Sequence, residues 1–217
     1  MTLLFLIRHG LTDQTGKRLY GRTPGIDLSL RGREQAEALV ERFQGIELAA
    51  VYSSPLERCT QTAQPLATAR KLKVREREGL IEMDAGAWTG RPLGSLARTK
   101  LWKVIQQEPS RATFPGGEDF VGAQDRAVEE VGKISKAHPR GGVAVFSHGD
   151  IIRLLVSHFA GAPIDEFQRV VVDTTSVSVF ALQTSGPPRL LLVNDMGGLG
   201  AFARTPPAKR SRPGVRG

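Results

Sequence analysis

The chain alternates between short apolar runs and amphipathic stretches. The runs at residues 3–7 and 143–146 are continuously apolar, which is typical of central parallel strands that helices cover on both faces. Shorter runs at 48–52 and 72–74 predict two further strands. Because helical patterns follow the runs at 3–7, 48–52 and 143–146, we expect βα units and a mixed or parallel α/β sheet.

Helix-forming signals are clearest in the first half of the chain. After Ser29, a candidate N-cap, apolar residues recur with helical spacing over 36–43. Ser54-Pro55-Leu56-Glu57 combines the spacing of a capping box with a proline at the first helical position. It predicts a helix that runs to about Arg70 and has Arg58 in its first turn. Further helices are expected over 97–105, 120–134 and 150–159, the last with Asp150 as its cap.

Two segments depart from the alternation of strand and helix. Residues 176–182 and 189–193 flank Ser185-Gly186-Pro187-Pro188 and predict two strands joined by a turn at a sheet edge. Residues 78–118 interrupt the alternation, and we expect them to form a small cap. A length of 217 residues fits one domain, which we place at 1–203.

Positive charge is concentrated near the C-terminus. The net charge is +8, but residues 204–217 hold five basic residues and no acidic one, so the preceding 203 residues carry only +3. Without apolar periodicity and with three prolines, this stretch is predicted to be a disordered basic tail. A non-catalytic phospholigand or nucleic-acid binder that uses the tail is a remote alternative. Its binding would weaken steeply with salt and be lost on deletion of 204–217.

The composition excludes several classes of protein. One cysteine, Cys59, excludes a disulfide framework and a zinc site with paired thiolates, and it indicates a reducing, cytoplasmic environment. The longest apolar run, 3–7, is too short to span a membrane, and no basic region precedes it as a signal peptide requires. We expect no metal, no other cofactor and no membrane partner.

Two histidines follow directly on predicted buried strands. Arg8-His9-Gly10 comes after the first run, and Ser147-His148-Gly149 comes after the run at 143–146. Since ligands of open α/β sheets bind outside the carboxyl ends of the strands, we expect both imidazoles at one edge. Arg58 is expected at the same edge, although a cation in a first helical turn opposes the macrodipole. Two guanidiniums and two imidazoles together require an anion, and a phosphate dianion satisfies them.

Phosphoryl transfer would also need a proton donor. Imidazole is a nucleophile toward phosphorus, so His9 or His148 can carry the phosphoryl group. Glu82 and Asp84 lie beside apolar residues that can raise a carboxyl pKa, and either can protonate a leaving alkoxide. The sequence alone does not choose between the two carboxyl groups.

In their order and spacing, these motifs resemble the histidine phosphatase superfamily, the phosphoglycerate-mutase-like proteins. The resemblance covers about residues 2–195. It implies a three-layer α/β/α fold with a mostly parallel central sheet. The motifs that carry it are Arg8-His9-Gly10-Leu11-Thr12, the stretch from Ser53 to Ala63, Glu82 ahead of Gly86-Ala87-Trp88-Thr89-Gly90, and Ser147-His148-Gly149.

The resemblance also implies a role for each site residue. His9 becomes the phosphohistidine, and Glu82 acts first as proton donor and then as base for the attacking water. The phosphoryl oxygens are bound by Arg8, Arg58 and His148. Gly149 is expected to offer its backbone N–H to the phosphate.

The chain departs from the family pattern at Thr15. Many members have an asparagine there, six residues after the nucleophile, but a hydroxyl still donates one hydrogen bond. We therefore include Thr15 among the phosphate- or substrate-binding residues, together with Arg22 from the following loop. Trp88 is expected to line the substrate entrance and Trp102 to lie in the core.

The compact Gly-x-Trp-x-Gly form at 86–90 resembles the phosphatase branch of the family. We therefore expect a metal-independent phosphomonoester hydrolase that acts on a small phosphorylated metabolite at mildly acidic to neutral pH. The alternative is a phosphoglycerate-type mutase, which would transfer the phosphoryl group with a bisphosphate primer. A homodimer is one oligomeric state that the sequence allows.

Overall fold

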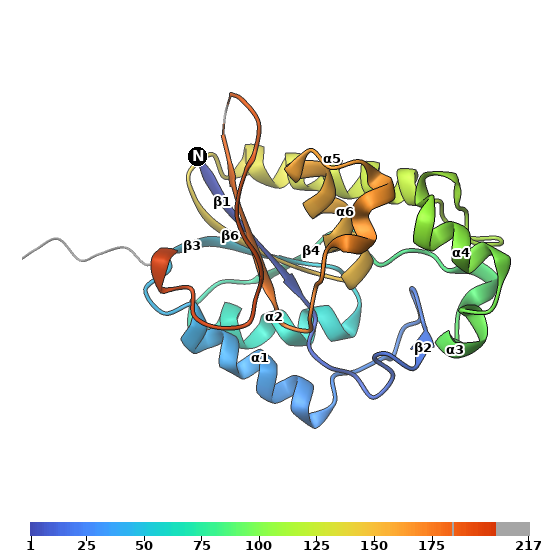
Figure 1. Ribbon diagram of the computed structural model, residues 1–217. Helices are drawn as coiled ribbons and strands as arrows, with labels where there is room; N and C mark the ends of the chain where they lie inside the picture. The colour runs from blue at the N-terminus through green and yellow to red at the C-terminus, as the bar shows by residue number, and fades with distance from the viewer. Residues whose placement is uncertain (184, 203–217) are drawn as a thin grey trace, which may run out of the picture.

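The computed structural model describes residues 1–183 and 185–202, so the predicted basic tail at 204–217 lies outside the described residues. Its main feature is a six-stranded sheet (Figure 1). Four neighbouring strands are parallel and two at one edge are antiparallel. In sheet order the strands are β4 (Val74–Glu76), β3 (Leu48–Ser53), β6 (Gly141–Ser147), β1 (Thr2–Arg8), β7 (Val177–Leu182) and β8 (Arg189–Asp195).

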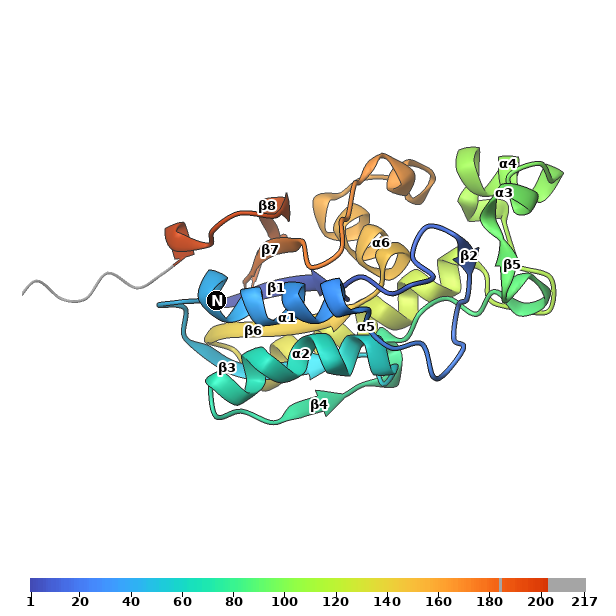
Figure 2. The same cartoon turned by 90° about the horizontal axis from the view of Figure 1, so that it is seen from below.

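Helices cover both faces of the sheet, which confirms the three-layer α/β/α architecture (Figures 1 and 2). Phe5 and Ile7 of β1 belong to the core on one side, and Leu4 and Leu6 belong to the core on the other. This alternation follows from the period of two residues in a strand. The first face packs against α1 (Leu30–Arg42) and α2 (Glu57–Ala69), and the second packs against α5 (Phe120–Ala137) and α6 (Gly149–Ala160).

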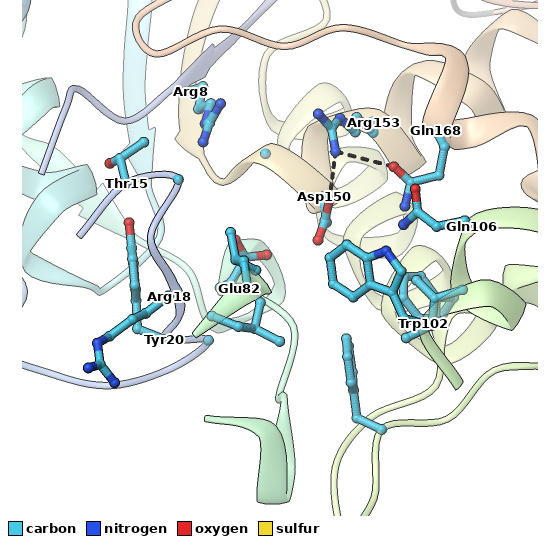
Figure 3. A pocket seen from close by; sticks show the side chains of 18 of the residues that line it. Arg8, Thr15, Arg18, Tyr20, Glu82, Trp102, Gln106, Asp150, Arg153 and Gln168 are labelled. Atoms are coloured by element: carbon cyan, nitrogen blue, oxygen red, sulfur yellow. Dashed lines mark hydrogen bonds and ion pairs between the residues drawn. The ribbon is translucent and has the colours of Figure 1, made fainter. Parts of the chain in front are cut away.

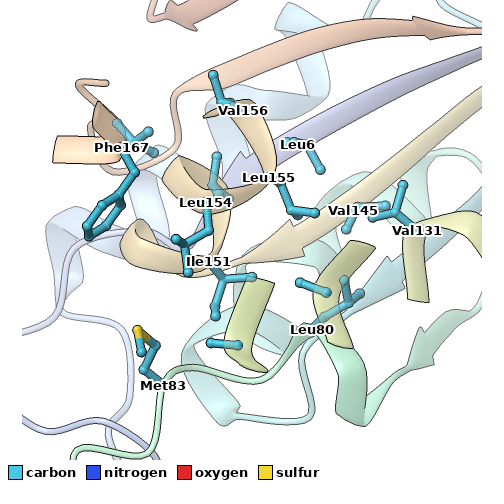
Figure 4. Close-up of a cluster of buried hydrophobic side chains, with 14 of the residues drawn as sticks. Leu6, Leu80, Met83, Val131, Val145, Ile151, Leu154, Leu155, Val156 and Phe167 are labelled. Carbon is cyan, nitrogen blue, oxygen red and sulfur yellow. The ribbon is translucent and has the colours of Figure 1, made fainter. Parts of the chain in front are cut away.

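The core between the sheet and α5 and α6 is built from aliphatic side chains (Figure 4). Leu6 and Val145, from neighbouring strands, are fully buried with Val131 of α5 and Leu155 of α6. Burying each such side chain contributes about 1.5–3 kcal/mol. The two continuous apolar runs of the sequence are therefore strands buried on both faces.

Residues 78–118, which we refer to as the cap, contain two short helices that lie at one end of the molecule in Figure 1. They contain no strand of the main sheet. The cap is joined to the rest of the chain by the pairing of β2 (Arg18–Leu19) with β5 (Arg91–Pro92). Its other elements are the 3-10 turns η1 (Glu78–Leu80), η2 (Gly86–Trp88) and η3 (Pro109–Arg111) and the helices α3 (Leu93–Leu96) and α4 (Lys100–Gln107).

Two 3-10 turns complete the described elements. The turn η4 (Ile164–Arg169) follows α6, and η5 (Gly200–Phe202) ends the described chain. Ser110 of the cap donates two hydrogen bonds to the Asp165 carboxylate of η4, from its backbone nitrogen at 2.9 Å and its hydroxyl at 3.0 Å. These bonds fasten the cap to the body of the molecule.

The starts of two helices differ from prediction. The N-cap of α2 is Leu56, whose apolar side chain cannot accept a hydrogen bond from the first turn of the helix. The predicted capping box at Ser54 is therefore wrong. The Ser54 hydroxyl lies instead 2.8 Å from Nε2 of His148, because the segment leaves β3 beside the end of β6. The N-cap of α6 is His148 rather than Asp150. Ser29 does cap α1, accepting from the Gly32 nitrogen.

Candidate active site

His9 and His148 lie at the carboxyl ends of the neighbouring parallel strands β1 and β6. Their rings are 5.4 Å apart between centroids and inclined at 62°, and both side chains are buried. Gly10 follows His9 where β1 meets α1, and a Cβ at Gly10 would lie 2.7 Å from the carbonyl oxygen of Gly32. Only glycine fits at this close approach, which holds the end of β1 against the helix.

The His9 imidazole has the form that a nucleophile requires. Its Nδ1 lies 2.8 Å from the carbonyl oxygen of Gly10. Since a carbonyl only accepts, Nδ1 carries the proton, and the lone pair of the neutral ring is on Nε2. Burial lowers the pKa of His9 well below 6.5, and the charges of Arg58 and Arg8 lower it further. The ring is therefore neutral at pH 7.

Arg58 and Arg8 bring positive charge to the histidines. Arg58 is fully buried; its Nη2 donates to the Gly21 carbonyl at 2.8 Å, and its guanidinium lies 4.9 Å from the centre of the Tyr20 ring. Nη1 of Arg8 donates to the Val172 carbonyl at 2.6 Å. Nε and Nη1 of Arg58 and Nε of Arg8 are buried and have no hydrogen-bond partner among the described residues. Unpaired buried guanidinium donors are costly, and an anion satisfies them.

His148 and Gly149 complete the positive end of the site. Nε2 of His148 faces the Ser54 hydroxyl, and Nδ1 lies 3.8 Å from Oε2 of Glu82. Burial, then the charges of Arg58 and of His9, lower the pKa of His148 well below 6.5. Gly149 is the first residue of α6, beside Nε of Arg8, so the positive end of the helix dipole points into the site.

The structure separates the two candidate carboxyl groups. Glu82 lines the pocket, and burial raises its pKa to about 7, with a further contribution from the negative charge of Asp150. Asp84 instead accepts a hydrogen bond from the Gly86 nitrogen at 2.9 Å and shapes the turn that follows. Glu82 is the carboxyl group placed to exchange a proton with a bound ligand.

Arg22 was expected to touch phosphate or substrate, but the structure places it behind Glu82, outside the pocket lining. Its Nε donates to the Glu82 carbonyl at 2.8 Å, and its Nη2 lies 3.1 Å from Oε2 of Glu118. Glu118 also accepts from Arg126 at 2.6 and 2.9 Å. This network, whose Glu118 and Arg126 no sequence motif indicated, holds the segment that carries Glu82.

A cavity of about 350 Å³ is lined by Arg8, His9, Glu82 and Gly149 (Figure 3). Arg58 and His148 are fully buried and are not among its lining residues. Thr15 lines the cavity as expected, with its hydroxyl accepting from the Thr12 nitrogen at 3.0 Å. The two tryptophans exchange their expected places: Trp102 lines the cavity, and Trp88 is a core residue with 4% exposure. Other lining residues that sequence reasoning missed are Arg18, Leu19, Tyr20, Leu93, Ile105, Gln106, Phe114, Phe120, Asp150, Arg153 and Gln168.

Residues 1–183 and 185–202 contain neither a metal-binding cluster nor a membrane-spanning helix. No group of three or more histidine, cysteine, aspartate or glutamate residues in this part of the chain is arranged to hold a metal ion. Within the same residues, no helix has the length and apolar character needed to cross a membrane.

A mostly parallel α/β sheet that carries two buried histidines, one buried arginine and one partly buried arginine at its carboxyl edge is typical of enzymes that act on phosphoryl groups. The family model described as "Histidine phosphatase superfamily (branch 1)" matches residues 4–196. The chain belongs to the histidine phosphatase superfamily.

Known relatives extend this finding. Phosphoserine phosphatase 1 of Hydrogenobacter thermophilus is 29% identical over 185 residues, which are 84% of this chain and 88% of the relative. The adenosylcobalamin/alpha-ribazole phosphatase of Escherichia coli is 28% identical over 172 residues, 78% and 85% of the two chains. The solved structure of Bacillus stearothermophilus YhfR superimposes with a TM-score of 0.84 at 27% identity, covering 91% of this chain and 98% of that one.

Proposed function

We propose that this phosphatase hydrolyses small phosphorylated metabolites through a phosphohistidine at His9, without a metal ion. The relatives named as phosphatases support the reaction class. The single observation that carries the proposal is the set of unpaired, buried guanidinium nitrogens of Arg58 and Arg8 beside the free Nε2 of His9. A phosphoryl group bound there places its oxygens on the arginines and its phosphorus against the nucleophile.

In the first step, the lone pair on Nε2 of His9 attacks phosphorus as the ester P–O bond breaks. The leaving oxygen takes the proton of Glu82, whose pKa of about 7 keeps a large fraction of the carboxyl protonated at neutral pH. Arg8, Arg58, His148 and the Gly149 N–H bind the phosphoryl oxygens, where charge-assisted donors stabilise the transition state. The products are a free alcohol and phosphohistidine.

In the second step, the Glu82 carboxylate takes a proton from water as the water oxygen attacks phosphorus. The P–N bond breaks, and its electron pair returns to Nε2 of His9. Inorganic phosphate leaves, and Glu82 is again protonated. Thr15, which also lines the pocket, is proposed to help position the phosphate with its hydroxyl group.

The test is phosphate release from 4-nitrophenyl phosphate and a metabolite panel, in the presence of a chelator, by wild type and His9→Ala. We expect chelator-resistant turnover that falls by about a thousandfold or more in His9→Ala. His158→Ala is the matched control, because it also replaces a histidine by alanine, but this histidine is exposed on α6 and does not line the pocket. Equal turnover in wild type and His9→Ala, or loss of turnover with chelator, would contradict the proposal.

A further inference from the structure

The half of the cavity that lies away from Arg8 and Arg18 has an apolar wall around Trp102 (Figure 3). Trp102 of α4 is its largest part, and its ring stacks on Trp88 with centroids 6.4 Å apart and planes 25° from parallel. Trp88 is itself buried, so its packing restricts the motion of the Trp102 ring. The other apolar members of the wall are Leu93, Ile105, Phe114 and Phe120.

A polar group borders this wall. Nη1 of Arg153 donates to Oδ1 of Asp150 at 3.2 Å and to Oε1 of Gln168 at 3.4 Å. The Asp150 carboxylate therefore neutralises Arg153. Its second oxygen accepts no hydrogen bond from the described residues, and Figure 3 shows Asp150 between Glu82 and Trp102. Nε of Arg153 also lacks a hydrogen-bond partner among the described residues but is buried, so the group that the border exposes to a ligand is the second oxygen of Asp150.

The two sides of this half-cavity come from different parts of the chain that are fastened together. Trp102 belongs to the cap, and Gln168 belongs to η4. The bonds between Ser110 and Asp165 join the cap to η4, eight residues from Trp102 and three from Gln168. The wall and its polar border are therefore held at a set separation in the free enzyme, which lowers the entropic cost of binding a ligand between them.

We propose that this half-cavity is a leaving-group subsite, which selects phosphomonoesters with a flat apolar body that ends in a hydrogen-bond donor. The inference rests on the proposed function, since it places the phosphoryl group at His9. A short polar leaving group would leave the Trp102 wall in contact with water. A ring packed on it removes apolar area from water, and the donor satisfies Asp150. Such remote binding raises kcat/KM when it is retained in the transition state.

The first test compares 2-phenylethyl phosphate with ethyl phosphate, two esters of primary alcohols that differ in the ring. We expect wild type to prefer the phenylethyl ester by about tenfold or more in kcat/KM. Trp102→Ala is expected to remove most of this preference, measured as the ratio of kcat/KM for the two esters. Trp102→Phe keeps an aromatic ring and is expected to retain part of the preference, and thermal unfolding checks that both variants fold.

The second test addresses the acceptor with 2-(4-aminomethylphenyl)ethyl phosphate and its 4-ethyl analogue, which has a methyl group in place of the ammonium group. Wild type is expected to prefer the ammonium ester, and Asp150→Asn to lower that preference by about tenfold. Using the ratio of the two esters cancels any effect of Asp150 on Glu82, because the same acid serves both.

The outcomes separate the two proposals. If wild type hydrolyses none of the esters, the proposed function fails. If it hydrolyses ethyl and phenylethyl phosphate equally well, or if Trp102→Ala slows both alike, only the subsite is overturned. An unchanged ester ratio in Asp150→Asn overturns the assignment of the acceptor.

Discussion

Arg58 is buried in the first turn of α2, where the helix macrodipole opposes its positive charge. The Gly21 carbonyl satisfies one of its nitrogens, and Glu57 precedes it in the same turn, yet two further nitrogens have no partner in the part of the chain that is described. Removing donors from water without partners costs about 1–3 kcal/mol each. We infer that the residue is retained at this cost for the anion that it binds.

We expect the pH dependence of the proposed reaction to follow the carboxyl group of Glu82, the proposed acid. Its carboxyl group must be protonated to act as the acid, so log kcat/KM is expected to fall as the pH rises through about 7, with a limiting slope of one. Burial is the main cause of the raised pKa and the charge of Asp150 the second, so Asp150→Asn is expected to move this limb to lower pH. The measurement is the pH–rate profile of wild type, Asp150→Asn and Glu82→Gln. A descending limb that persists unchanged in Glu82→Gln would show that another group supplies the proton.

At the scale of elements, the contact between α1 and the loop after β1 depends on Gly32. A Cβ at this position would lie 2.0 Å from the carbonyl oxygen of Leu11. Because this oxygen belongs to the backbone, the clash can be relieved only by moving the loop. Gly→Ala within a helix ordinarily stabilises by about 0.5–1 kcal/mol, but here we expect a loss of stability and of activity, because the displaced loop follows His9.

Gly132 in α5 is the matched control, since nothing lies within 4 Å of a Cβ built on it. Gly132→Ala is expected to stabilise the protein by about 0.5–1 kcal/mol and to leave phosphate release unchanged. Urea unfolding and turnover of both variants make the comparison. If Gly32→Ala is as stable as Gly132→Ala, the hypothesis that close packing of α1 on this loop requires glycine at position 32 is wrong.

The elements themselves were largely predictable from local sequence. The apolar runs at β1, β3 and β6, the amphipathic faces of α1 and α5 and the edge pair β7 and β8 are where the pattern placed them. The capping box at Ser54 failed because the motif lies at the end of a strand, where His148, which follows the neighbouring strand β6, is the nearer partner for the serine. Local propensity is overruled where a neighbouring strand offers a better hydrogen bond.

At the scale of the whole molecule, the site makes stability depend on pH. The pKa values of His9 and His148 lie well below 6.5 in the folded protein. As the pH falls below 6.5, these two histidines are therefore protonated in the unfolded chain but stay neutral in the folded protein. These two groups therefore contribute stability that is present above pH 6.5 and lost below it. Glu82 acts in the opposite sense, because its folded pKa of about 7 exceeds the 4.5 of an unperturbed glutamate, so its contribution is lost as the pH rises through 7.

Replacing Glu82 therefore removes the contribution that opposes the effect of the two histidines on the pH dependence of the free energy of unfolding. Each proton corresponds to about 1.4 kcal/mol per pH unit, so between about pH 4.5 and 6.5 the stability of Glu82→Gln is expected to fall with decreasing pH more steeply than that of wild type, by about one proton. Urea unfolding of both proteins at several pH values measures the two slopes. Parallel slopes would mean that Glu82 is not protonated in the folded protein in this range.

The sequence by itself determined which groups meet at the edge of the sheet. Arg8 and His9 follow one buried strand, His148 follows another and Arg58 follows a third, and parallel strands bring their carboxyl ends together whatever the loops do. Only the tertiary structure decided the choice of Glu82 over Asp84, the position of Arg22 behind the site and the exchange of Trp88 with Trp102. These depend on contacts between segments far apart in the chain, such as Arg22 with Glu118, 96 residues away, and on which side chain a loop turns toward the cavity. Hydrophobic periodicity specifies strands and helices and the faces they bury, but an irregular loop has no such period, so its side chains are oriented by the contacts that the folded protein provides.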